Sequence, residues 1–259
     1  MTTQTLDRAI ALLRLLAASP EGTRLVDLQA ATGLTKPTVH RILDTLCHHD
    51  LAARDPASRR YALGPEISLL AASVATSRID LVELAREHML EVAHRTGDTS
   101  FLMARSGFDT VCLDRQTGSY PVKAFTVDVG SRRPLGLGAG GIILLGTLDD
   151  TMREAAYQRV HEYLKPLHRV TVAQVRAAVE QAQRKGYALS NGFVVESVGG
   201  VAVPIMGPDG KVVASMSVAA IKERVGPRRL PQVLSILQSH AKSIEQRLAE
   251  RIKKKSSTY

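Results

Sequence analysis

The chain has 259 residues, enough for two domains of ordinary size, and its formal net charge is +9. A basic chain suits a polyanionic partner, but 4% aromatic residues and no tryptophan argue against aromatic platforms for single-stranded nucleic acid. The two cysteines give no disulfide framework, and neither a signal peptide nor an apolar run of about 20 residues is visible. We therefore expect a cytoplasmic protein with no membrane partner.

The chain opens with an amphipathic helix predicted from Leu6 to Ala18. Its apolar face is expected to contain Leu6, Ile10, Leu13 and Ala17. A second helix starts at Leu25 and ends at Gly33, because glycine readily adopts the left-handed conformation of a helix C-cap. Thr35 can cap a third helix, and Pro37 fits its first turn. The apolar face of this third helix comprises Val39, Ile42, Leu43 and Leu46.

Two short helices joined by a tight turn are typical of a helix-turn-helix, and a hairpin rich in arginine, a wing, follows up to Leu63. An ordinary charged pair of helices would explain the periodicity, but not this succession of motifs. The sequence therefore predicts binding to double-stranded operator DNA. The expected contacts lie on the recognition helix and the wing: Thr35, Lys36, Thr38, His40, Arg41, Arg54, Arg59 and Arg60.

The predicted organisation has a winged helix-turn-helix domain over residues 1–64, a linker helix over residues 65–79 and a second domain over residues 80–259. The linker is more apolar than a free tether needs to be, which suggests packing against another protomer or the wing domain. Its apolar residues are Ile67, Leu69, Leu70, Ala72 and Val74.

The second domain mixes helices with short strands, which indicates an α+β fold. Helices are expected over 80–94, 138–146, 149–160, 171–185 and 230–252. Strands are expected over 100–105, 110–114, 122–127, 201–206 and 212–220, with a further strand at the GYAL sequence before Ser190.

Several motifs occur in a fixed order along the chain: TVHRILDTL, a wing ending in YALG, LVELAREHMLEVAHRTGDT, RRPLGLGAGG and GYALSNG followed by VPIMGPDGKVVASMSVAA. Together they resemble the IclR family of bacterial transcriptional regulators, from about Thr5 to about Leu248. The resemblance implies a GAF-like effector-binding domain, a small carboxylic acid as effector, and a homodimer or a dimer of dimers on DNA. It also favours repression, and it implies no cofactor.

The same resemblance implies an effector site in which the backbone amides of Ala139 and Gly140 meet the carboxylate. A helix N-terminus suits an anion because its free N–H groups and its dipole point outward. Matched positions, together with candidate apolar walls, add Met103, Leu135, Leu137, Ser190, Gly200, Ser217 and Ala219, with Val203 and Met216 as further wall candidates. None is basic, so amides and hydroxyls would hold the carboxylate, and Gly140→Leu is expected to fill the site without unfolding the domain. The resemblance also indicates that positions 190, 200 and 219 are less polar here than in some relatives. This difference favours a larger or more apolar acid, such as an aromatic one.

Two other chemical interpretations were weighed. The segment 136–141 matches the G-x-G-x-x-G pattern of a dinucleotide-binding enzyme, but Pro134 argues against the buried parallel strand that this fingerprint requires. Cys47, His48 and His49 suggest a metal site, yet successive helical residues point about 100° apart and cannot face one ion. We therefore expect neither an enzyme nor a metal protein.

Overall fold

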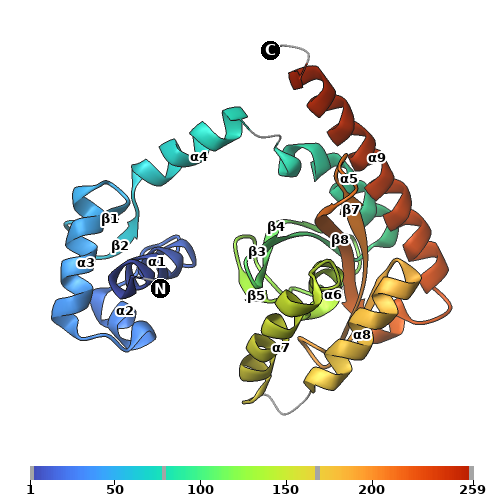
Figure 1. Cartoon of the computed structure of the whole chain (residues 1–259), viewed down its shortest axis with the longest axis horizontal. Coiled ribbons are helices and arrows are strands. Elements are labelled where there is room, and N and C mark those ends of the chain that lie inside the picture. The colour runs from blue at the N-terminus through green and yellow to red at the C-terminus, as the bar shows by residue number, and fades with distance from the viewer. Residues whose placement is uncertain (1–2, 78–79, 167–169, 257–259) are drawn as a thin grey trace. The chain divides into compact units, whose positions relative to one another are not determined.

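The computed structural model describes residues 3–77, 80–166 and 170–256, and the chain divides into two compact units, residues 1–79 and 80–259 (Figure 1). Each unit is built around cores of its own. In the described ranges, no helix combines the length and the apolar character needed to cross a membrane.

The first unit is a three-helix domain with a hairpin and a following helix. Its elements are α1 (Gln4–Ala17), α2 (Leu25–Thr32), α3 (Lys36–His48), β1 (Ala52–Arg54), β2 (Tyr61–Leu63) and α4 (Pro65–Ser77). Gly33 ends α2 with a φ of 66°, as expected for a left-handed cap. The predicted helix-turn-helix, wing and linker helix are all present.

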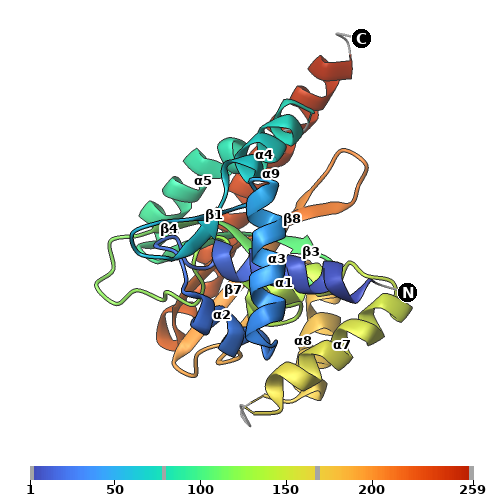
Figure 2. The same cartoon turned by 90° about the vertical axis from the view of Figure 1, so that its left-hand side faces the viewer.

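The apolar face predicted for the first helix was largely wrong, and of its four residues Leu13 alone packs against the core of this unit. Leu12 and Leu16 are the buried residues of α1, and they pack with the predicted apolar residues of α3. Figure 2 shows helix α3 crossing α1. Leu6 and Ile10 are 60% and 38% exposed. Because α1 carries leucines on two sides, its periodicity alone could not identify the side that the domain buries.

The second unit contains a six-stranded antiparallel sheet in the order β5-β4-β3-β8-β7-β6. Its strands are β3 (Thr99–Ser106), β4 (Asp109–Thr117), β5 (Arg132–Pro134), β6 (Ala188–Asn191), β7 (Val198–Met206) and β8 (Val212–Ile221). Its helices are α5 (Leu81–Thr96), α6 (Gly138–Leu145), α7 (Asp150–Leu164), α8 (Val172–Lys185), the short 3₁₀ helix η1 (Lys222–Val225) and α9 (Leu230–Ser256).

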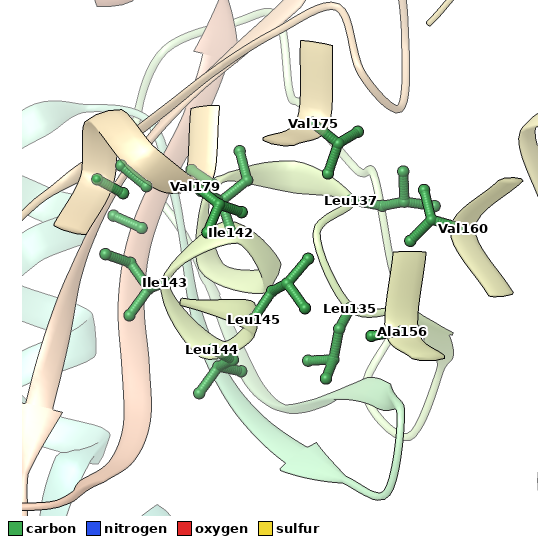
Figure 3. Close-up of a cluster of buried hydrophobic side chains, with 14 of the residues drawn as sticks. Leu135, Leu137, Ile142, Ile143, Leu144, Leu145, Ala156, Val160, Val175 and Val179 are labelled. Atoms are coloured by element: carbon green, nitrogen blue, oxygen red, sulfur yellow. The ribbon is translucent and has the colours of Figure 1, made fainter. Parts of the chain in front are cut away.

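The two faces of this sheet have separate cores because successive strand residues point to opposite sides. On one face, Leu102, Val203 and Met216 pack with α5 and α9, which lie side by side (Figure 1). On the other face, Phe101 and Met103 join a core formed with α6, α7 and α8. Figure 3 shows Ile142 and Leu145 of α6 within this second core.

The strand predicted over 122–127 was wrong, and the strand that pairs with β4 on the side away from β3 is β5. Val122 and Phe125 are 54% and 57% exposed, so the apolar residues that suggested a strand there do not belong to a buried face. Pro134 lies on β5, an edge strand, where a missing N–H costs no ladder hydrogen bond.

Candidate functional sites

The outward side of α3 presents the five residues expected to meet DNA from this helix. Thr35, Lys36, His40 and Arg41 are exposed, and Thr38 is half-buried. Thr35 occupies the N-cap position, but its hydroxyl shares a 2.9 Å hydrogen bond with that of Thr38 instead of accepting from a backbone amide. Both hydroxyls therefore sit at the exposed start of α3.

His40 is held by a neighbour that the sequence analysis missed. Its Nδ1 lies 2.7 Å from an Oδ2 of Asp44, one helical turn further on, and both side chains are about half exposed. The i, i+4 spacing could have revealed this contact. Because Nδ1 faces the carboxylate, Nε2 is the ring nitrogen left to meet another molecule.

The three arginines of the wing differ in their surroundings. Arg60 is half-buried and donates to the carbonyl of Gly22 at 2.8 Å, which ties the wing to the domain. Arg54 lies with its guanidinium carbon 5.5 Å from the centre of the Tyr61 ring. Arg59 is exposed, its side chain has no partner among the described residues, and its φ is 57°. Arg59 is therefore the wing residue best placed to reach a phosphate.

Asp55 shapes the wing turn. Its Oδ1 accepts hydrogen bonds from the amides of Ala57 and Ser58 at 2.8 and 2.7 Å. These bonds lower the pKa of Asp55, because they stabilise the charged carboxylate. The hairpin that presents Arg59 is thus fixed by local chemistry.

A cavity in the second unit brings together most of the residues predicted to bind an effector. It leaves about 60 Å³ for the centres of water-sized molecules, and part of it opens to solvent. Eight of the nine predicted residues line it: Met103, Leu137, Ala139, Gly140, Ser190, Gly200, Ser217 and Ala219. These residues come from α6, the turn before it and four strands of the sheet.

The start of α6 forms one wall of the cavity. Its first-turn amides, at Gly138, Ala139 and Gly140, have no acceptor within the helix. Gly200 lets this helix approach the sheet, because a Cβ there would lie 3.3 Å from the Cβ of Ala139. This tight packing gives a physical reason for glycine at position 200.

Four side chains with hydroxyl groups line the cavity: Thr110, Thr126, Ser190 and Ser217. Ser190 and Ser217 are 8% and 7% exposed, and neither hydroxyl has a protein partner among the described residues. Thr110, which the sequence analysis did not single out, also lines the cavity, and its buried Oγ1 has no partner among the described residues. Ser215 differs, since it is fully buried and donates to the carbonyl of Gly140 at 3.2 Å.

The cavity also contains a positive charge, whereas the sequence predicted no basic residue at the site. Arg133 of β5 lines the cavity and donates through Nη2 to the carbonyl of Thr126. It directly precedes Pro134 and the glycine-rich turn. Its proximity in sequence was visible, but its orientation depends on the pairing of β5 with β4.

Leu135 does not line the cavity. It is fully buried in the core beside Leu145 and Ala156, as Figure 3 shows. Val203 and Met216 are also absent from the cavity, because they pair with each other on the opposite face of the sheet. The sequence identified the strands but not which face of each strand the cavity uses.

The structure gives the glycine-rich segment a packing role at its first residue. A Cβ on Gly136 would lie 2.7 and 2.8 Å from side-chain carbons of Leu145 and Val175, and its φ is 89°. The preceding strand β5 is a short antiparallel edge strand, so the context of a dinucleotide fingerprint is missing. Across the described ranges, no cluster of three or more His, Cys, Asp or Glu side chains could hold a metal ion.

Comparisons with protein families match both units. The description "Bacterial transcriptional regulator IclR C-terminal" fits residues 73–246, and the IclR helix-turn-helix domain fits residues 5–56. Among curated proteins, the chain is similar to the HTH-type transcriptional regulator XynR of Escherichia coli, with 27% identity over 91% of this chain and 93% of that protein. It is also similar to the regulator KipR of Bacillus subtilis, with 24% identity over 95% and 97%.

Solved structures show the same fold. An IclR transcriptional regulator from Alicyclobacillus acidocaldarius has a TM-score of 0.75 at 24% identity, covering 96% of this chain and all of that one. An IclR homologue from Microbacterium hydrocarbonoxydans, complexed with 4-hydroxybenzoate, has a TM-score of 0.74 at 23% identity, covering 95% and 100%. The likeness to these two structures concerns the fold alone.

Proposed function

Because the chain belongs to the IclR family of bacterial transcriptional regulators and is not an enzyme, we propose that it is a repressor whose operator binding responds to a small carboxylic acid. The observation that supports effector sensing best is the cavity with hydrogen-bond donors and an arginine on its walls. The exposed recognition helix and wing supply the DNA-binding surface.

The proposed DNA contacts follow from exposure and charge. Thr38, His40 and Arg41 would face base edges in the major groove, while Lys36 and Thr35 at the start of α3 would meet phosphates. Arg54 and Arg59 of the wing would contact phosphates or the minor groove, and Arg60 would mainly hold the wing in place through Gly22.

Arg41→Ala tests the recognition helix. The variant should weaken binding to an operator isolated by selection from random duplexes by about 1–3 kcal/mol, if Arg41 reads a base edge. Arg184→Ala, on the exposed side of α8, is the matched control and should leave affinity unchanged. Wild-type affinity for Arg41→Ala at equal salt would remove Arg41 from the proposed contacts.

The proposed effector carboxylate meets the start of α6. The amides of Ala139 and Gly140 and the hydroxyls of Ser190 and Ser217 would donate to it, and Phe101 and Met103 would cover the apolar part. The relative solved with 4-hydroxybenzoate supports an aromatic acid as the first probe.

The structure changes the choice of blocking variant. A Cβ on Gly140 would lie 2.9 Å from Ser215 Oγ and 3.0 Å from Met103 Cγ, so Gly140→Leu would overpack the core as well as fill the site. Ala219 is half-buried and lines the cavity, and Ala219→Leu is the better blocking variant. Ala173→Leu, exposed on α8, is its control.

A thermal-shift titration with benzoate and 4-hydroxybenzoate tests the cavity. Wild type and Ala173→Leu should show a midpoint that rises with ligand concentration, because a ligand that binds only the folded state stabilises it by mass action. Ala219→Leu should bind operator but lose this rise. An equal rise in Ala219→Leu would show that the acid binds elsewhere.

We also propose that the protein assembles as a dimer or a dimer of dimers. Leu6 of α1 and Leu69 of α4 are large apolar side chains that are 60% and 64% exposed, and an interface with another protomer would bury them. The side chains of Ala72 and Val74, also expected to pack, lie outside the described residues. Light scattering that shows a monomer at micromolar concentration would refute this assembly.

A further inference from the structure

The polar groups of the cavity come from two separate parts of the sheet. Ser217 and Ser190 lie on β8 and β6, close to the start of α6 in the cavity wall. Thr110 and Arg133 lie on β4 and β5, where they are direct partners in the strand register. In the sheet order, β3 lies between the strands of Thr110 and Ser217.

The strand register gives the separation of the two groups. Thr110 pairs with Arg105 of β3, and Ser217 pairs with Phe101 of the same strand. Four residues along β3 and two strand spacings across it place the two α-carbons about 16 Å apart along the sheet, and less across its curvature. Side chains stand roughly perpendicular to a sheet, so the curvature of the sheet, and not the reach of the side chains along it, brings the two polar groups closer than this. One ligand that reaches both groups therefore needs two polar ends held apart by a spacer.

The group on β4 and β5 has the chemistry of an anion site. Thr110 is 1% exposed, and its Oγ1 has no hydrogen-bond partner among the described residues although it lines the cavity. A Cβ on Gly141 would lie 3.1 Å from this oxygen, so the glycine keeps the hydroxyl uncovered. An unsatisfied buried hydroxyl is costly, which favours an acceptor from a ligand.

Arg133 adds a positive charge beside this hydroxyl. Among the described residues that line the cavity, it is the one charged side chain. Its bond to the carbonyl of Thr126 uses one of its five N–H donors, and the guanidinium group cannot accept. A carboxylate can accept hydrogen bonds from both Arg133 and Thr110. Because the proposed function already places one carboxylate at the start of α6, this would be a second one.

We propose that the effector is a dicarboxylate whose two acid groups are held apart by a spacer, such as a benzene ring substituted at positions 1 and 4. One carboxylate binds the start of α6 with Ser190 and Ser217, and the other binds Arg133 and Thr110. The inference rests on the proposed effector site and adds the second acid group to it.

Isothermal titration of the full-length protein with matched acids tests this pairing. Benzene-1,4-dicarboxylate should bind at least about tenfold more tightly than benzoate, since hydrogen bonds to charged groups are strong. Benzene-1,2-dicarboxylate carries the same charge but cannot span the cavity, and it should not gain over benzoate. Adipate and hexanoate are the matching aliphatic diacid and monoacid, and adipate should likewise bind more tightly than hexanoate.

Variants then assign the gain to its residues. Arg133→Gln and Thr110→Val should each lower the ratio of the 1,4-diacid affinity to the benzoate affinity, with benzoate itself changed by less than about threefold. Arg105→Gln is the matched control, because Arg105 also donates to a backbone carbonyl, that of Gly107, but does not line the cavity. Its ratio should equal that of the wild type.

The outcomes separate the two proposals. Equal affinity for benzoate and the 1,4-diacid, with no gain for adipate over hexanoate, would overturn the dicarboxylate while leaving the effector site in place. If the Arg133 and Thr110 variants lost affinity for benzoate and for the 1,4-diacid to the same extent, those residues would serve the first carboxylate or folding. That result would also overturn the dicarboxylate proposal. Failure of every acid to bind the wild type would overturn the effector site itself and the dicarboxylate with it.

Discussion

Replacing Arg59 by glycine should raise the stability of the N-terminal unit and weaken its binding to DNA. Arg59 has a φ of 57°, in the left-handed region that costs an ordinary residue roughly 1 kcal/mol and costs glycine little. Glycine also loses more backbone freedom on folding, which offsets part of this gain. We therefore expect a net increase of about 0.5 kcal/mol in the free energy of unfolding. The same change removes a charge that has no partner among the described residues and is free to meet a phosphate.

The loss of one phosphate contact should lower the slope of log K against log salt by about 0.9. Fluorescence anisotropy with a selected operator at 50–200 mM salt measures the slope, and urea unfolding measures the stability. Arg60→Ala is the comparison, because it removes the 2.8 Å bond to Gly22 and should lower stability by about 1 kcal/mol. An unchanged slope in Arg59→Gly would refute the phosphate contact, and a loss of stability would refute the strain argument.

Three further predictions concern the stability and reactivity of the chain. Burial raises the pKa of Cys112 to about 11, so iodoacetamide at pH 8 should modify Cys47 first and Cys112 only after unfolding. Burial, with nearby cations, lowers the pKa values of His88 and His240, whose Nδ1 atoms lie 3.0 Å apart. Around these lowered pKa values the folded state binds fewer protons than the unfolded chain, so its free energy of unfolding falls as the pH falls. Urea unfolding should therefore show lower stability at pH 5.5 than at pH 7.5, and the difference should be smaller in His88→Gln. Asp98 is buried and lies 2.6 Å from both Arg224 and Arg229, so Asp98→Asn should lower the urea-unfolding free energy by about 3 kcal/mol, and a loss below 1 kcal/mol would contradict a structural role for this cluster.

Local sequence signals predicted the helix-turn-helix because its determinants are local. Gly33 ends one helix, Pro37 starts the next, and the apolar spacing of α3 defines its buried face without reference to the rest of the chain. The resemblance to a family, together with the candidate apolar walls, then located eight of the residues that line the cavity. Neither source required knowledge of how distant strands pair.

The features that the sequence did not predict depend on tertiary packing. The buried side of α1, the exposed loop around Phe125 and the inward orientation of Arg133 are set by which surfaces meet, and several local patterns were compatible with them. Thr110 was unremarkable as one hydroxyl on a strand, and only its buried Oγ1 beside Gly141 gives it a candidate role.

The alternation of strand side chains connects the cavity with the helices on the far face of the sheet. On β3, Phe101 and Met103 line the cavity while Leu102 between them packs in the core with α5 and α9. Protein interiors are densely packed, so a ligand that displaces β3 must also displace its contacts on the other face. Since α5 follows the linker region directly in sequence, we expect it to be the first helix on the path from an occupied cavity to the DNA-binding unit.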